Sequence, residues 1–276
     1  MKSLVSVNWL FEHKDDPDLV ILDASPRQNK SNLTVEYPTL KIKGAKIFDM
    51  ESCFLDKESS IPNMFPSEKI FADECRKIGI TNRSIIVAYD NLGIYTSPRV
   101  WWMFKSMGHT NIGVLDGGLS AWRNGNFECE PRVFKASMRS EFTANYESDL
   151  VVNSEQILDN ISNNKMILID ARSKGRFNAE IPEPRENMAS GHIPNSLNLP
   201  FNQVLKTGKM KSKTELKGIF TNFKFQNKKV VFTCGSGITA CIILLAFEQV
   251  SSNKKALYDG SWSEWGRGNK FPVAKK

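Results

Sequence analysis

The feature that most constrains this chain is an internal repeat, because its two halves carry the same motifs in the same order. The matched features, in chain order, are Val-Ile-Leu-Asp-Ala at 20–24 and Ile-Leu-Ile-Asp-Ala at 167–171, residues 42–45 and 193–196, the apolar runs that end at Asp90 and at Cys234, and Asp-Gly-Gly at 116–118 and Asp-Gly-Ser at 259–261. The aspartates at 23 and 170, the residues at 90 and 234, and the aspartates at 116 and 259 stand 147, 144 and 143 positions apart. A nearly constant period indicates two copies of one domain.

Within each copy, short β-branched runs alternate with longer segments that we predict to be amphipathic helices, at residues 97–107 and 238–250. Strands that are apolar on both faces are typical of a parallel sheet covered by helices on each side. The predicted fold class is therefore α/β, with two similar domains, each a parallel β-sheet flanked by helices. A polar stretch with little periodicity separates them, which predicts domains at 1–135 and 151–276 with a linker at 136–150.

Bulk composition excludes several classes of function. The net charge of +7 is spread along the 276 residues without a long basic run, so we expect no nucleic-acid partner. The longest apolar stretch, at residues 242–247, is too short to span a bilayer, so we expect no membrane association. We expect neither a metal nor another cofactor, because no cysteine pair has CxxC spacing and the three histidines lie far apart.

The five cysteines favour reduced thiols over a disulfide framework, because their number is odd and their positions are scattered. We see no targeting leader at the start of the sequence. Reduced thiols indicate a reducing compartment, and the lack of a visible leader favours the cytoplasm over the mitochondrion. The four cysteines other than Cys234 are interpreted as idle or buried thiols, which leaves redox regulation open.

The loop at residues 234–240, hereafter the cysteine loop, carries the candidate chemistry. Cys234 follows a predicted buried strand and precedes a predicted helix, the place where open α/β sheets bind ligands. Gly235 and Gly237 allow successive amide N–H groups to point at one spot, and the helix dipole adds partial positive charge. Ser236 and Thr239 add hydroxyl donors. Such a nest would stabilise a thiolate or a persulfide, whereas a plain buried cysteine before a turn is the alternative.

The first copy has Asp90 where the second has Cys234, and a carboxylate cannot carry sulfur. One copy is therefore expected to be catalytic and the other supportive.

Together these residues resemble the rhodanese superfamily over nearly the whole chain. The motifs that carry the resemblance are the cysteine loop and residues 116–118, 170–172, 176–177, 182–185 and 190–194. Within that superfamily the loop is similar to that of the two-domain 3-mercaptopyruvate sulfurtransferases, since thiosulfate sulfurtransferases usually carry basic residues there. The resemblance implies an active cysteine in the second domain and an inactive first domain.

The resemblance also implies the roles of further residues. Arg176 and Arg185 would bind the carboxylate and keto oxygen of 3-mercaptopyruvate, which suits a planar guanidinium fork. Ser236 would act beside Cys234, and Gly235, Gly237, Ile238 and Thr239 would surround the substrate. In the first domain Tyr95 and Arg99 match a segment that faces the family's active site. Glu51 and Asn63 stand where the family is described with an Asp and a His that relay a proton, and Asn63 cannot do so.

The implied reaction moves sulfur from 3-mercaptopyruvate to Cys234, releases pyruvate, and passes the sulfur to a thiol such as thioredoxin or to cyanide. The sequence leaves three alternatives. A thiosulfate sulfurtransferase is disfavoured by the loop without basic residues. Cysteine phosphatases need an arginine six residues after the cysteine, where this chain has Ala240. A non-catalytic sulfur-carrier or binding module remains the third. The sequence does not identify the physiological acceptor or the oligomeric state.

Overall fold

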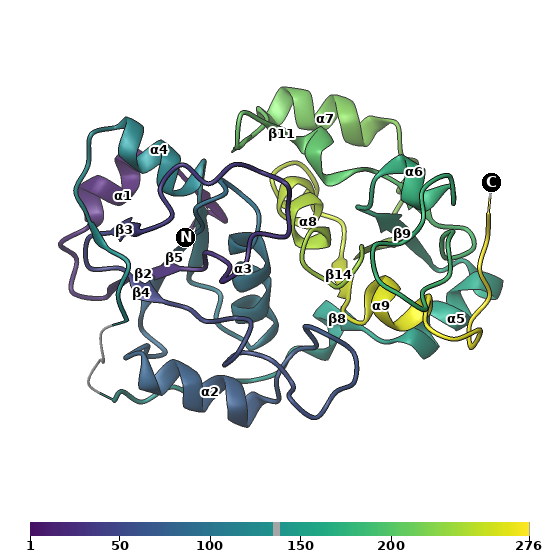
Figure 1. The fold of residues 1–276 in the computed structure, drawn as a ribbon, viewed down its shortest axis with the longest axis horizontal. Coiled ribbons are helices and arrows are strands. Elements are labelled where there is room, and N and C mark those ends of the chain that lie inside the picture. Colours follow the sequence, from purple (N-terminus) through teal and green to yellow (C-terminus); the bar gives the residue numbers. More distant parts are fainter. Residues whose placement is uncertain (135–138, 276) are drawn as a thin grey trace. The chain divides into compact units, whose positions relative to one another are not determined.

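The computed structural model describes residues 1–134 and 139–275, so the start of the predicted linker lies outside the described residues. The chain forms two compact units (Figure 1). The first comprises Met1–Asp56, Phe65–Glu147 and Lys206–Met210. The second comprises Lys57–Met64, Ser148–Leu205 and Lys211–Lys276. Each unit thus includes a short segment from the opposite half of the sequence.

The first unit is built on a five-stranded parallel sheet. Its strands, in spatial order, are β1 (Leu4–Val5), β6 (Ile112–Leu115), β5 (Ile85–Tyr89), β2 (Leu19–Asp23) and β4 (Lys46–Ile47). Its helices are α1 (Val7–His13), α2 (Glu68–Lys77), α3 (Ser97–Ser106) and α4 (Gly118–Asn124). A separate antiparallel pair joins β3 (Leu40–Ile42) to β7 (Cys129–Pro131).

The second unit repeats this plan. Its parallel sheet has the order β8 (Val151–Val152), β14 (Lys255–Tyr258), β13 (Lys229–Thr233), β9 (Met166–Asp170) and β10 (Leu197–Asn198). Its helices are α5 (Ser154–Asn163), α6 (Lys174–Phe177), α7 (Lys213–Thr221), α8 (Ala240–Glu248) and α9 (Ser261–Trp265), with short 3₁₀ turns η1 (Ser148–Leu150) and η2 (Phe201–Val204). The small hairpin of β11 (Leu205–Lys206) and β12 (Lys209–Met210) follows η2.

The two sheets have the same strand order, with matched strands at matched places, which confirms the predicted pair of α/β domains. Helices cover both faces of each sheet. In the first unit α3 packs on β5 and β6, and Leu10 of α1 and Leu119 of α4 join Val87 of β5 in a core on the other face. In the second, α8 packs on β13 and β14, and α5 and α9 contribute to the opposite core.

The helix α8 differs from its prediction. Its residues from Ala240 to Phe247 are each 0% exposed, so the helix is buried on every side and is not amphipathic. An unbroken apolar sequence is what such a position requires, because no face of the helix meets water. In the described part of the chain, no helix is long and apolar enough to cross a membrane.

Gly118, at the start of α4, is a position where the backbone conformation and the space both demand glycine. Its φ is +55°, and a Cβ there would lie 2.2 Å from the carbonyl oxygen of Asp90 and 2.5 Å from that of Gly93. Gly44 offers a matched contrast, since its φ is +78° but a Cβ would meet nothing within 4 Å.

We expect Gly44→Ala to lower the free energy of unfolding by about 1–2 kcal/mol, the cost of the left-handed conformation. Gly118→Ala should lower it by several kcal/mol more, because backbone carbonyl groups must move. Thermal and urea unfolding of the two variants measure the difference, and equal losses would contradict the close approach at Gly118.

Candidate active site

Cys234 lies at the carboxyl end of the central strand β13 and six residues before α8. It is a free thiol with 2% of its surface exposed. The cysteine loop therefore occupies the edge of the sheet at which α/β proteins bind ligands, as predicted. The burial of α8 fixes the position of the loop, because the helix cannot shift without disturbing the core.

The first turn of α9 holds the first residues of the cysteine loop by four hydrogen bonds. The Cys234 N–H donates to Ser261 Oγ at 3.2 Å, and the Cys234 carbonyl accepts from the Trp262 N–H at 2.9 Å. The Gly235 carbonyl accepts from the Ser263 N–H at 2.9 Å and from Ser263 Oγ at 2.6 Å. The backbone at the nucleophile candidate is thus fixed from one side.

The rest of the loop curls as the glycine positions require. Gly237 has a φ of +76°, and its carbonyl accepts from the Cys241 thiol at 3.3 Å. Ser236 is buried, whereas Ile238 and Thr239 are partly exposed. Four of the predicted substrate-binding positions therefore belong to one continuous turn around Cys234.

The first unit shows what such a loop can hold. One oxygen of the Asp90 carboxylate accepts from three amide groups, those of Tyr95, Thr96 and Ser97, at 2.9–3.0 Å, and from Ser97 Oγ at 2.7 Å. The other oxygen accepts from the Leu92 N–H at 3.0 Å. This is a backbone nest closed on a negative charge that the chain itself supplies.

The two loops are also anchored in the same way. The Leu119 N–H donates to the Asp90 carbonyl at 3.0 Å, just as the Trp262 N–H donates to that of Cys234. Counting from Asp90 and from Cys234, Gly93 matches Gly237, and both have positive φ. The internal repeat therefore extends to single hydrogen bonds.

Arg176, at the end of α6, approaches the cysteine loop. Its Nη2 lies 3.3 Å from the place where a Cβ on Gly235 would stand, so a side chain at position 235 would press on the guanidinium. Its Nε donates to Glu183 Oε1 at 3.1 Å and its Nη2 forms a 2.5 Å ion pair with Glu183 Oε2. Glu183 thus pairs with the Nε–Nη2 edge of the Arg176 guanidinium.

Arg185 contacts the same part of the loop from a different direction. Its Nη1 lies 3.5 Å from the Gly235 carbonyl and donates to Ser263 Oγ. Both arginines expected to bind substrate are therefore beside Gly235, the residue that follows Cys234.

Arg172 and Glu183 lie within the family motifs at 170–172 and 182–185, but the sequence assigns them no role. Arg172 is fully buried, bonds Asp170 through Nε and Nη2, bonds Glu183 through Nη1 at 2.8 Å, and lies 4.1 Å from the ring of Trp262. Burial alone would lower the pKa of Arg172, but Asp170 and Glu183 outweigh it and raise the pKa. The spacing of these residues along the chain gave no signal of this network.

The predicted first-domain contributors fall in different units. Tyr95 donates its amide to Asp90, and Arg99 is buried with its guanidinium 3.9 Å from the ring of Phe65, both in the first unit. Glu51 also lies there. Asn63 belongs to the segment of the second unit in which Ser60 accepts a hydrogen bond from Arg267, and it has a φ of +62°.

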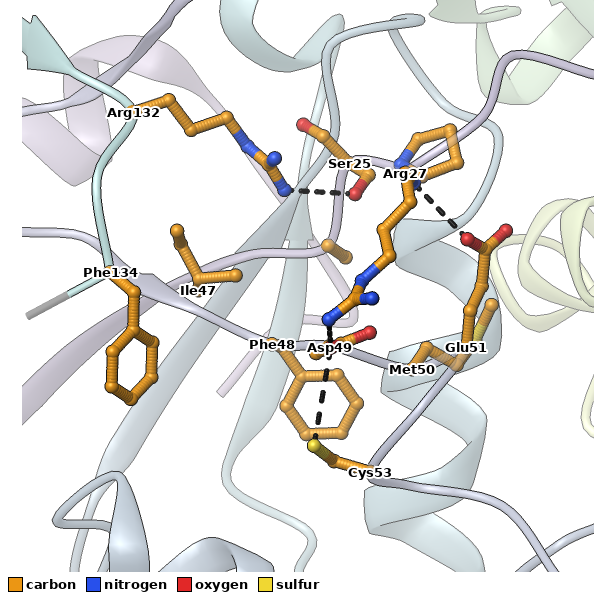
Figure 2. A pocket seen from close by; sticks show the side chains of 12 residues that line it. Ser25, Arg27, Ile47, Phe48, Asp49, Met50, Glu51, Cys53, Arg132 and Phe134 are labelled. Carbon is orange, nitrogen blue, oxygen red and sulfur yellow. Dashed lines mark hydrogen bonds and ion pairs between the residues drawn. The ribbon is translucent and has the colours of Figure 1, made fainter. Parts of the chain in front are cut away.

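Glu51 lines a cavity of about 380 Å³ where β2 and β4 end (Figure 2). Its Oε2 accepts from the Arg27 N–H at 3.2 Å, while the Arg27 guanidinium forms an ion pair with Asp49. Arg132 closes the other side, with its Nε 2.7 Å from Asp23. Glu51 is therefore neighboured by a cation within its own domain.

The Asp90 nest leads to a stability prediction. Asp90→Asn places an NH₂ group or a neutral oxygen among five donors, so we expect a loss of about 3–5 kcal/mol in the free energy of unfolding. Asp15→Asn is the matched control, since its carboxylate is exposed and should change stability by less than about 1 kcal/mol. Thermal unfolding and amide exchange at residues 92–97 test this, and an Asp90→Asn variant as stable as the control would contradict it.

Comparisons with known proteins agree with the geometry. The family model for the rhodanese-like domain matches residues 6–125 and 153–267. The chain is 36% identical over 273 residues to a 3-mercaptopyruvate sulfurtransferase of Escherichia coli K12, covering 98% of this chain and 96% of that one. It is 38% identical over 287 residues to a thiosulfate sulfurtransferase of Rattus norvegicus, covering 96% and 92%.

Solved structures give the same answer. The crystal structure of the Escherichia coli 3-mercaptopyruvate sulfurtransferase SseA superposes with a TM-score of 0.82 at 35% identity, covering 96% of this chain and all of that chain. The Tum1 protein of Saccharomyces cerevisiae superposes with a TM-score of 0.87 at 27% identity, covering 99% and 98%. With two matched domains and relatives of equal length, the chain belongs to the rhodanese family and is a two-domain sulfurtransferase.

Proposed function

We propose that this protein moves sulfur from 3-mercaptopyruvate, through a persulfide on Cys234, to a thiol acceptor such as thioredoxin, or to cyanide, and releases pyruvate. The observation that carries the proposal is the pairing of two guanidinium groups, Arg176 and Arg185, with the turn directly after Cys234. The Escherichia coli and mouse relatives named for this donor are each 36% identical to the chain.

In the first half-reaction the Cys234 thiolate attacks the sulfur of 3-mercaptopyruvate. A sulfur–sulfur bond forms, the carbon–sulfur bond breaks, and its electron pair goes to carbon as the enolate of pyruvate. Arg176 and Arg185 hold the carboxylate and the keto oxygen on which charge develops. The enolate takes one proton, which the substrate thiol or the Ser236 hydroxyl supplies. This proton route avoids residue 63, because an asparagine side chain cannot transfer a proton.

In the second half-reaction the acceptor takes the outer sulfur and returns Cys234 to the thiolate. A thiol acceptor becomes a persulfide and cyanide becomes thiocyanate, so the kinetics are expected to be ping-pong. The loop amides are proposed to stabilise the anionic sulfur in the way that their counterparts surround Asp90. The free, scattered cysteines suit a reducing compartment such as the cytoplasm.

Thiosulfate is the second candidate donor, because the rat thiosulfate sulfurtransferase is 38% identical to the chain. Residues 235–240 carry no basic side chain to attract that dianion. Turnover of the two donors under identical conditions decides between them, and a higher kcat/KM for thiosulfate would reverse the preference.

Replacing the nucleophile tests the reaction directly. We expect Cys234→Ser to release no pyruvate in a single turnover and to gain no 32-dalton sulfur adduct, since the covalent step is lost. Cys53→Ser, at a half-exposed cysteine outside the loop, should keep both. Rapid-quench pyruvate assays and peptide mass spectrometry measure these outcomes, and a pyruvate burst from Cys234→Ser would rule out its role.

Replacing the arginines tests how the donor is held. Arg176→Lys and Arg185→Lys should each raise KM or lower kcat/KM for 3-mercaptopyruvate roughly tenfold to a hundredfold, because an ammonium cannot make the bidentate contact. Arg83→Lys, on an exposed loop, is the matched control. Steady-state kinetics on the three variants measure these constants. Unchanged KM and kcat/KM for both Arg176→Lys and Arg185→Lys would show that these arginines do not bind the donor.

A further inference from the structure

Glu183 belongs to a buried ion-pair network formed with Asp170, Arg172 and Arg176. The side chains of Asp170 and Arg172 are each 1% exposed and that of Glu183 is 4% exposed. Glu183 Oε1 accepts from both arginines, at 2.8 Å from Arg172 and at 3.1 Å from Arg176. Two carboxylates thus face two guanidinium groups, and the formal charge of the network is zero.

Within this network Arg176 alone has a partly exposed side chain, at 26%. Glu183 takes its Nε–Nη2 edge, and among the described residues its Nη1 makes no hydrogen bond. Nη1 is therefore the end of the fork that Glu183 leaves to a ligand, while Nη2, which Glu183 holds, is the atom that faces Gly235. Glu183 decides which edge of Arg176 that is, because a side-on carboxylate leaves only the opposite end of a planar fork.

Arg185 is electrostatically different from Arg176. Its polar contacts are with the Gly235 carbonyl and the Ser263 hydroxyl, and no carboxylate of the described chain lies within ion-pair distance of it. The carboxylate of Glu264, the residue that follows Ser263, accepts from the hydroxyls of Tyr258 and Ser154. The uncompensated positive charge beside the cysteine loop is therefore that of Arg185.

We infer that Glu183 is a positioning and specificity-determining residue, which aims Arg176 at the donor and cancels its charge so that the site prefers a monoanionic sulfur donor over a dianionic one. The inference rests on the proposed function. A single uncompensated guanidinium matches the single charge of a keto-acid carboxylate, whereas thiosulfate brings two charges. Arg176 then contributes directed hydrogen bonds, and Arg185 contributes the charge.

The test removes the negative charge of Glu183 and keeps the shape of its side chain. Glu183→Gln adds one net positive charge beside the loop and releases Arg176. We expect kcat/KM for 3-mercaptopyruvate to fall and that for thiosulfate to rise, so that their ratio changes about tenfold. Glu186→Gln makes the same change of charge at an exposed position three residues away and should leave the ratio unaltered. If Glu183 has only a structural role, Glu183→Gln lowers kcat/KM for both donors by the same factor. That result would overturn the inference.

Glu183→Asp keeps the charge and shortens the side chain. It should lower kcat/KM for both donors by a similar factor and keep the ratio between them. This variant tests the inference independently if Glu183→Gln folds poorly. A shift of the ratio in Glu183→Asp toward thiosulfate would contradict the role of charge.

A binding measurement separates this inference from the proposed reaction. With Cys234→Ser as background, titration with pyruvate and with sulfite, at a pH above the second pKa of sulfite and followed by tryptophan fluorescence, compares a monoanion with a dianion without turnover. Adding Glu183→Gln should tighten sulfite binding about tenfold relative to pyruvate. If the wild-type enzyme uses neither donor, the proposed function fails, yet this titration still decides the role of Glu183. Equal changes for both anions would overturn it.

Discussion

The backbone hydrogen bond from the Trp262 N–H to the Cys234 carbonyl is the constraint on which the site depends. It joins the end of the central strand to the beginning of α9, and so ties two neighbouring connections at the carboxyl edge of the sheet. The equivalent bond from Leu119 to Asp90 stands in the first unit, where an aspartate takes the place of the cysteine. The bond therefore belongs to the architecture of the fold, and the chemistry is added to a loop that is already fixed.

Much of this arrangement could be predicted from the sequence, because the internal repeat specifies equivalent strands and therefore equivalent loops. The position of Cys234 between a buried strand and a helix followed from hydrophobic patterning alone. The prediction of an amphipathic α8 was wrong, since a window of apolar residues does not reveal whether a helix has one covered face or none. Burial on every side depends on neighbours that are distant in sequence.

Other features had no local signal. Residues 57–64 and 206–210 each join the unit built mainly by the other half of the chain, as when the Met210 N–H donates to Asp116 at 2.9 Å. Side-chain partnership was equally hidden. The pairing of Glu183 with both Arg172 and Arg176 requires α6 and the following loop to fold back, which spacing in the sequence does not specify. The residue roles themselves remain predictions.

The carboxylate of Asp90 has a consequence for how the two domains respond to sulfur chemistry. An anion fixed covalently in the first nest makes that domain's stability independent of any reaction state. In the second domain the proposed reaction changes the charge and size of the Cys234 side chain whenever sulfur is gained or lost, so that ligation there would be thermodynamically linked to folding. Under that reaction the heat tolerance of the first domain would stay constant, and that of the second would vary with the sulfur bound to Cys234.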